Sequence, residues 1–150
     1  MTGERRAGPV RARLAAIVAL ALAAQGCSHP PPDSTPEGAV RLFLDAMDND
    51  DTASMHRAYD LLGPAGRAEL VARARRTSLL QGRQVAPWEM IAAGLFGLAF
   101  RPKVMRSTGV GERATVEVFG EDPQSEHASV ACVHEAAGWR IEPGRPEPAN

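Results

Sequence analysis

The chain of 150 residues contains only two cysteines, a single lysine and few aromatic residues, which make up 5% of the sequence. Its net charge is −1. A strongly basic face is therefore not expected, which argues against a nucleic-acid partner. The apolar run from Leu14 to Ala24 is far shorter than the about 20 residues that a membrane-spanning helix needs. Met90 to Phe100 carries no polar side chain but is also too short to span a bilayer.

The first 27 residues have the layout of an export signal. Arginines at positions 5, 6, 11 and 13 precede the apolar run, and Gln25-Gly26 follows it. A positive leader, a short apolar stretch and a small residue before the cleavage point are typical of a secretory signal peptide. With Cys27 as the first residue after cleavage, the segment resembles a bacterial lipoprotein signal. The resemblance implies removal of residues 1–26 and attachment of diacylglycerol and a palmitate-type acyl chain to Cys27.

Two alternatives remain open for this terminus. Acylation of Cys27 would leave Cys132 as the only free thiol, whereas ordinary signal cleavage would permit a Cys27–Cys132 disulfide in the oxidising periplasm. Ser28 stands where an enteric inner-membrane retention signal would have aspartate. We therefore expect a cell-envelope location, lipid-anchored to the outer membrane and facing the periplasm.

The rest of the chain is predicted to form one domain. Residues 1–26 carry a charge of +3, so their removal from a chain of −1 leaves a mature protein of −4. Residues 27–34, with three consecutive prolines, are interpreted as an extended spacer. Residues 35–142 are predicted to fold, and the proline-rich residues 143–150 to form a flexible tail.

Helices are predicted in the first half of this domain. Thr35 is a candidate cap for a helix that ends near Asn49, with an apolar stripe of period 3.6. Asp51 or Thr52 would cap a second helix that ends at Gly63. A third would run from residue 64 to about 77, and a short one from 88 to about 93.

The second half changes to the alternating pattern of strands. Strands are predicted at 103–108, 113–119, 128–134 and 138–142, with Val116, Val118 and Ile141 pointing inward. The first and last connections are short enough to require antiparallel hairpins. Helices followed by antiparallel strands predict an α+β fold, with the N-terminal helices packed on a curved sheet of about four strands.

Several segments resemble the nuclear-transport-factor-2-like fold, also called cystatin-like or SnoaL-like, as carried by small bacterial lipoproteins. The segments are Thr35-Pro36-Glu37 with Ala39 to Leu44, Ala58 to Pro64, Gly111 to Val118 and Gly138 to Ile141. The resemblance implies a cone-shaped α+β roll whose open end often holds an apolar small molecule. It carries over no catalytic residue, cofactor or metal ligand.

The candidate site residues each have a structural alternative. Aromatic side chains supply most of the large apolar area of the domain and are first of all core residues, although some would also line a pocket: Tyr59, Trp88, Phe96, Phe100 and Trp139. His56 and Asp60 lie one helical turn apart, yet they face solvent beside the apolar stripe. Cys132 and His134 share a strand face, but two ligands do not make a zinc site.

The basic side of the third predicted helix carries Arg67, Arg73, Arg75 and Arg76. These residues would either contact anionic lipid headgroups or form a solvated helix face, and we favour the second interpretation. The function expected from the sequence is a non-catalytic, lipid-anchored envelope domain that binds a small apolar ligand or a protein partner. The alternative is an isomerase or cyclase that uses a titratable side chain at the cone mouth. Homodimerisation through the sheet is a third option.

Overall fold

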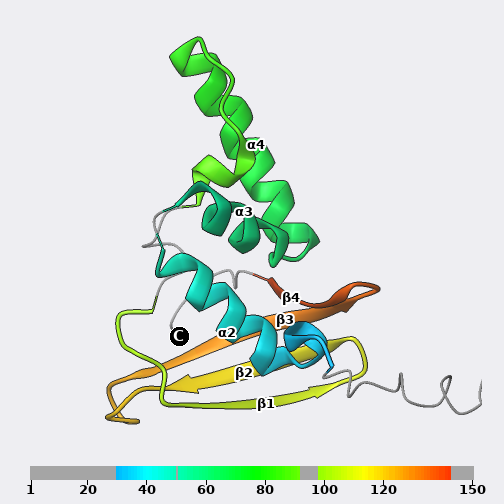
Figure 1. The fold of residues 1–150 in the computed structure, drawn as a ribbon, viewed down its shortest axis with the longest axis vertical. Coiled ribbons are helices and arrows are strands. Elements are labelled where there is room, and N and C mark those ends of the chain that lie inside the picture. The colour runs from blue at the N-terminus through cyan, green and yellow to red at the C-terminus, as the bar shows by residue number, and fades with distance from the viewer. Residues whose placement is uncertain (1–29, 50, 92–97, 143–150) are drawn as a thin grey trace, which may run out of the picture. The chain divides into compact units, whose positions relative to one another are not determined.

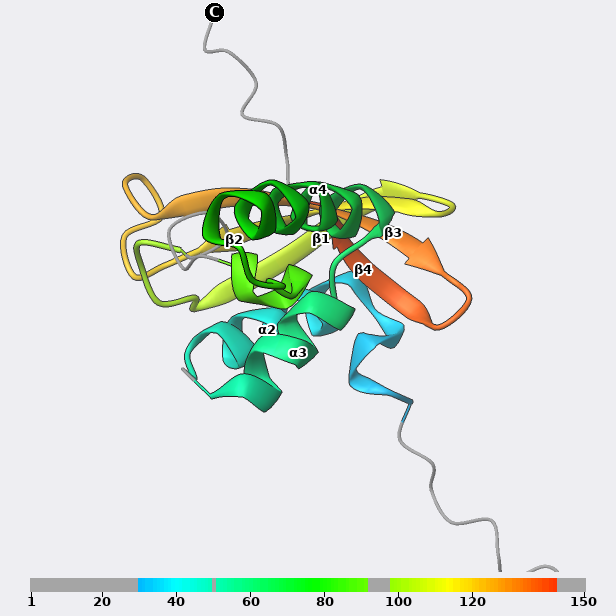
Figure 2. The same cartoon turned by 90° about the horizontal axis from the view of Figure 1, so that it is seen from above.

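The computed structural model describes residues 30–49, 51–91 and 98–142, with three α-helices and one antiparallel sheet of four strands (Figure 1). The chain divides into two units, residues 1–30 and 31–150, and the described helices and strands all lie in the second. Within it, α2 lies across one face of the sheet, and α4 extends away from the sheet (Figures 1 and 2). The α+β class and the antiparallel four-stranded sheet are thereby confirmed.

The first two predicted helices are present as α2 (Pro36–Met47) and α3 (Thr52–Asp60). Thr35 Oγ1 accepts the Gly38 amide at 3.1 Å and Asp51 Oδ1 accepts the Ser54 amide at 2.9 Å, so both helices begin at side-chain caps. The predicted end of α3 at Gly63 was wrong. Residues 61–63 instead pair with β4 through Ile141, whose amide and carbonyl bond the carbonyl of Leu61 and the amide of Gly63.

Two other helical boundaries were also wrong. Helix α4 spans Pro64–Gln81 and ends at Gly82, whose φ of 64° is the left-handed conformation that glycine adopts without strain. It is thus one turn longer than predicted, and Ser78 in that last turn donates to the Ala74 carbonyl. The short helix predicted from residue 88 is a 3₁₀ turn, η2 (Pro87–Met90). Residues 92–93 of that prediction lie outside the described residues.

The sheet contains β1 (Val104–Val110), β2 (Arg113–Phe119), β3 (His127–Glu135) and β4 (Gly138–Glu142) in sequence order. All neighbours are antiparallel, and the first and last pairs form hairpins, as predicted. Their turns contain two residues each and are shorter than the predicted strand bounds implied. Both ends of each strand lie within two residues of the predicted bounds. Among the described residues, no helix combines the length and the apolar character that crossing a membrane requires.

The core lies between α2 and the inner face of the sheet. Phe43 from α2 is 2% exposed, and Val116 and Val118 from β2 are fully buried, as the alternation predicted. Cys132 and Ile141 continue this face onto β3 and β4, because the register places them opposite each other.

At the edge of the sheet, the Glu37 carboxylate accepts a hydrogen bond from the amide of Ser107 in β1 at 2.9 Å. Burial opposes ionisation of Glu37, yet its hydrogen bonds to Ser107 outweigh that effect and lower its pKa.

Candidate functional site

The aromatic candidates for a pocket serve mainly as packing residues. Tyr59, Phe100 and Trp139 are partly buried against the core, and Trp88 lies against the His56 ring at 4.5 Å between centroids. Phe96 lies outside the described residues. The three grooves between the described elements contain none of the other four in their walls. The pocket lined by these five residues therefore stays a prediction.

The two titratable pairs considered from the sequence do not form a reaction centre. His56 and Asp60 are both exposed, as predicted, and the histidine ring contacts Trp88 instead. Cys132 is buried while His134 is exposed and stacks edge-on against Trp139. Burial, assisted by the nearby Glu37 charge, raises the pKa of the Cys132 thiol to about 12, so the sulfur stays protonated and unreactive. Within residues 30–49, 51–91 and 98–142, no three potential ligands gather for a metal.

The structure corrects the interpretation of residues 32–34 as an extended spacer. Pro32–Ser34 forms a 3₁₀ turn, η1, which packs against α2 and β4. A Cβ atom on Gly38 would lie only 1.7 Å from the Pro32 carbonyl oxygen, and one on Gly138 would lie 2.8 Å from Asp33 Oδ2. Two glycines from distant parts of the chain thus leave the space that η1 fills. We call η1 with Gly38 and Gly138 the N-terminal clamp.

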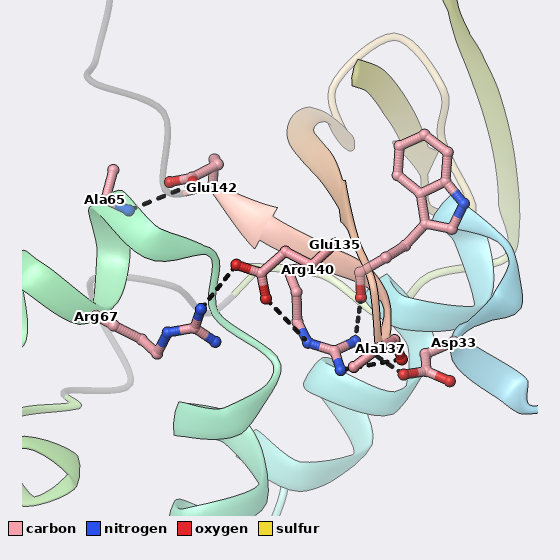
Figure 3. A network of polar contacts seen from close by, with 8 residues as sticks. Asp33, Ala65, Arg67, Glu135, Ala137, Arg140 and Glu142 are labelled. Atoms are coloured by element: carbon pink, nitrogen blue, oxygen red, sulfur yellow. Dashed lines mark hydrogen bonds and ion pairs between the residues drawn. The ribbon is translucent and has the colours of Figure 1, made fainter. Parts of the chain in front are cut away.

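A charged network fastens this clamp to the sheet and to α4 (Figure 3). Arg140 of β4 binds Asp33 at 2.8 Å and approaches Glu135 at 3.9 Å, and Arg67 of α4 binds Glu135 at 2.8 Å. Arg140 also donates to the carbonyls of Trp139 and Ala137, so its guanidinium is held in one orientation. Because its side chain is only 11% exposed, the network is screened less by solvent than a surface ion pair.

The first turn of α4 is held by a separate contact. Helix α4 begins at Gly63 without a side-chain cap, and Glu142 Oε1 lies 3.4 Å from the Ala65 amide, in the space a Gly63 side chain would need. A carboxylate is favoured there because the exposed amides make the helix N-terminus positive. Its second oxygen, Oε2, is buried and has no hydrogen-bond partner among the described residues.

Replacing Gly38 with alanine tests the clamp. Alanine alone would favour α2 by about 0.5–1 kcal/mol, but its methyl group would collide with the backbone of Pro32. We expect η1 to detach while α2 remains helical. Hydrogen–deuterium exchange of the Ser34 amide, which donates to the Pro31 carbonyl at 2.9 Å, should then accelerate. Unchanged protection of Ser34 would contradict the clamp. Gly111→Ala, where a Cβ atom would meet nothing within 4 Å but the φ of 67° disfavours alanine, is the control for altered global stability.

Three grooves open between these elements. The first, of about 470 Å³, lies over the cross-strand row Thr108–Thr115–Ala131–Glu142 of the sheet. The second, of about 410 Å³, lies between α2 and α3, with Leu42 and Leu61 in its wall and Arg140 at one end. The third, of about 710 Å³, runs beside the last turns of α4. None brings together a nucleophile, a base and an oxyanion donor, as acid–base or covalent catalysis would require.

The far end of α4 exposes two of the three leucines of this helix. Leu79 and Leu80 are 86% and 87% exposed. The basic residues of this helix divide into two groups: Arg67 and Arg73 bind Glu135 and Glu69, whereas Arg75 and Arg76 are exposed and have no acidic partner among the described residues. The Glu69–Arg73 pair joins residues four apart on the helix.

Sequence reasoning missed two features that the structure adds, the clamp and the exposed apolar end of α4. Gly82, a frequent helix terminator, is the one local signal that could have located that end. No protein-family model, curated protein or solved structure matches the chain. The nuclear-transport-factor-2-like resemblance therefore remains a prediction.

Proposed function

We propose that the protein is an exported, lipid-anchored envelope domain with a non-catalytic role: it holds a protein-binding surface at a fixed orientation on the membrane. The observation that carries this proposal is the N-terminal clamp. Because η1 is built into the fold, only four residues, 28–31, lie between Cys27 and Pro32, so their Cα atoms are at most about 18 Å apart in a fully extended chain. A tether this short, docked at its end, restricts how the domain can turn.

A protein partner is a better candidate for the bound molecule than a small apolar ligand. Tyr59, Phe100 and Trp139 are packed on the core, and Trp88 lies against His56. The three grooves described above are bordered by charged groups. Small apolar ligands bind in mostly apolar cavities that cover most of their surface. The cone-shaped roll implied by the family resemblance is part of this proposal, with its interior filled by side chains such as Phe43 and Val116.

Replacing Cys27 with serine tests the anchoring. Each buried methylene of an acyl chain contributes about 0.8 kcal/mol to membrane affinity, so loss of the chains should move the protein from the membrane to the soluble fraction. The intact mass of wild-type protein should show a chain that begins at Cys27 and carries diacylglycerol and an acyl group. Serine replacement of Cys132, a buried thiol, should leave the protein in the membrane fraction. A Cys27→Ser protein that still sediments with membranes would defeat the proposal.

A further inference from the structure

The last turn of α4 carries an apolar surface that the fold does not use. Leu79 and Leu80 leave more than four fifths of their side chains in solvent, whereas Leu70 on the same helix is 1% exposed. Beside them the third groove is walled by Val71, Ala74, Val85 and Pro87. Contiguous exposed apolar residues next to a concave surface are typical of an interaction site. We call the groove with Leu79 and Leu80 the α4-end surface.

Positive charge is in excess around the α4-end surface. Arg73 forms an ion pair with Glu69, and Arg83 forms one with Glu89, so the charges of these four side chains cancel. Arg75, which lines the groove, and Arg76 next to it are not paired with any acidic group that the structure describes. Two positive charges thus remain beside the apolar residues. A partner that offsets them must carry acidic groups next to apolar ones.

We propose that the α4-end surface binds a protein segment in which apolar side chains, seated in the groove, are flanked by aspartate or glutamate residues that meet Arg75 and Arg76. A concave groove walled by valine and proline accepts side chains that project from a partner. A second copy of the chain fits poorly, because a two-fold contact would bring the unpaired arginines of both copies together.

The bilayer that holds the anchor is also a poor occupant. The clamp holds η1 against β4, and the first residues of α4 also contact β4. From there α4 extends for about 27 Å away from the sheet (Figure 1). Leu79 and Leu80 are at the far end of that helix. This step alone rests on the proposed anchoring. Peptide binding does not depend on it, so a peptide-display experiment can fail while the anchoring of Cys27 holds, and the reverse.

The test uses full-length protein in detergent micelles and a display library of short random peptides. Wild-type protein should enrich peptides that combine apolar and acidic residues. In the Leu79→Asp/Leu80→Asp variant their affinity should fall by about tenfold or more, as for removal of an interface hot spot. The Arg75→Glu/Arg76→Glu variant should reverse the preference, enriching basic apolar peptides. The control is Val110→Asp, which places one aspartate at a 92% exposed apolar position at the end of β1 and should bind like wild type.

Three results would overturn the proposal. One is enrichment that is absent, or that neither double variant changes. Another is preferential binding to phosphatidylglycerol vesicles rather than phosphatidylcholine vesicles, in the absence of peptide binding. If that binding required Leu79 and Leu80, the surface would be assigned to an anionic bilayer. The third is a concentration-dependent dimer that the Leu79→Asp/Leu80→Asp variant loses, which would assign it to a second copy. Unchanged thermal unfolding of every variant would show that these losses are not caused by misfolding.

Discussion

Replacing Arg140 with alanine is expected to lower the free energy of unfolding by about 2–4 kcal/mol. The Arg140 side chain is 11% exposed and faces Asp33 and Glu135, which are 19% and 26% exposed. Its removal would leave two partly buried carboxylates close together without the cation that separates them. Removing one partner of a buried ion pair costs more than the pair itself contributes, because the remaining charge stays desolvated.

Urea unfolding of the Cys27→Ser protein, with and without Arg140→Ala, measures this effect. Arg140→Lys should show a smaller loss, since lysine keeps the charge but not the fork that also reaches the Trp139 and Ala137 carbonyls. The matched control is Arg106→Ala on β1, an exposed arginine for which the described residues offer no partner, and its loss should stay below about 0.5 kcal/mol. A loss for Arg140→Ala no larger than that of the control would contradict the structural role of the network.

Replacing Phe43 with alanine should lower the free energy of unfolding by about 3–5 kcal/mol. Phe43 is 2% exposed and joins α2 to Val116 and Val118 of the sheet, so truncation leaves a cavity that rigid neighbours cannot fill. Leu80→Ala removes a similar apolar side chain that is 87% exposed, and it should cost less than about 0.5 kcal/mol.

The contrast between these two variants carries information about function. Equal stability losses for Phe43→Ala and Leu80→Ala, measured by thermal or urea unfolding, would show that Leu80 is part of the fold and would remove the reason to assign it to a partner. We expect instead that Leu80 contributes to binding and Phe43 to stability, although both are large apolar residues on helices of the same unit.

The fold class could be predicted because its signals are local. Thr35 and Asp51 cap helices through amides three residues away, and the alternation in β2 reports which side chains face α2. The end of α4 was missed because its last turns pack little, so no apolar stripe continues past Thr77 to reveal them. There the leucines are exposed rather than periodic.

The clamp could not be predicted for the opposite reason, since its contacts are distant in sequence. Asp33 binds Arg140 across 107 residues, and consecutive prolines before it are as typical of an extended spacer as of a docked turn. Gly138 shows no local sign that its missing side chain makes room for η1. Composition alone does not tell a core residue from a cavity wall, so the pocket of aromatic residues stays a prediction.

Depth measurements on the anchored protein test the proposed orientation most directly. Single nitroxide labels at Ser34→Cys, on η1, and Leu80→Cys, at the far end of α4, would be compared in vesicles that contain nickel-chelating lipids. Cys132 should not be labelled, because it is buried and its pKa is raised to about 12. We expect strong relaxation by nickel of the label at position 34 and little at position 80. Equal relaxation at both positions, or stronger relaxation at position 80, would contradict a domain held by its N-terminal clamp with α4 pointing away from the membrane.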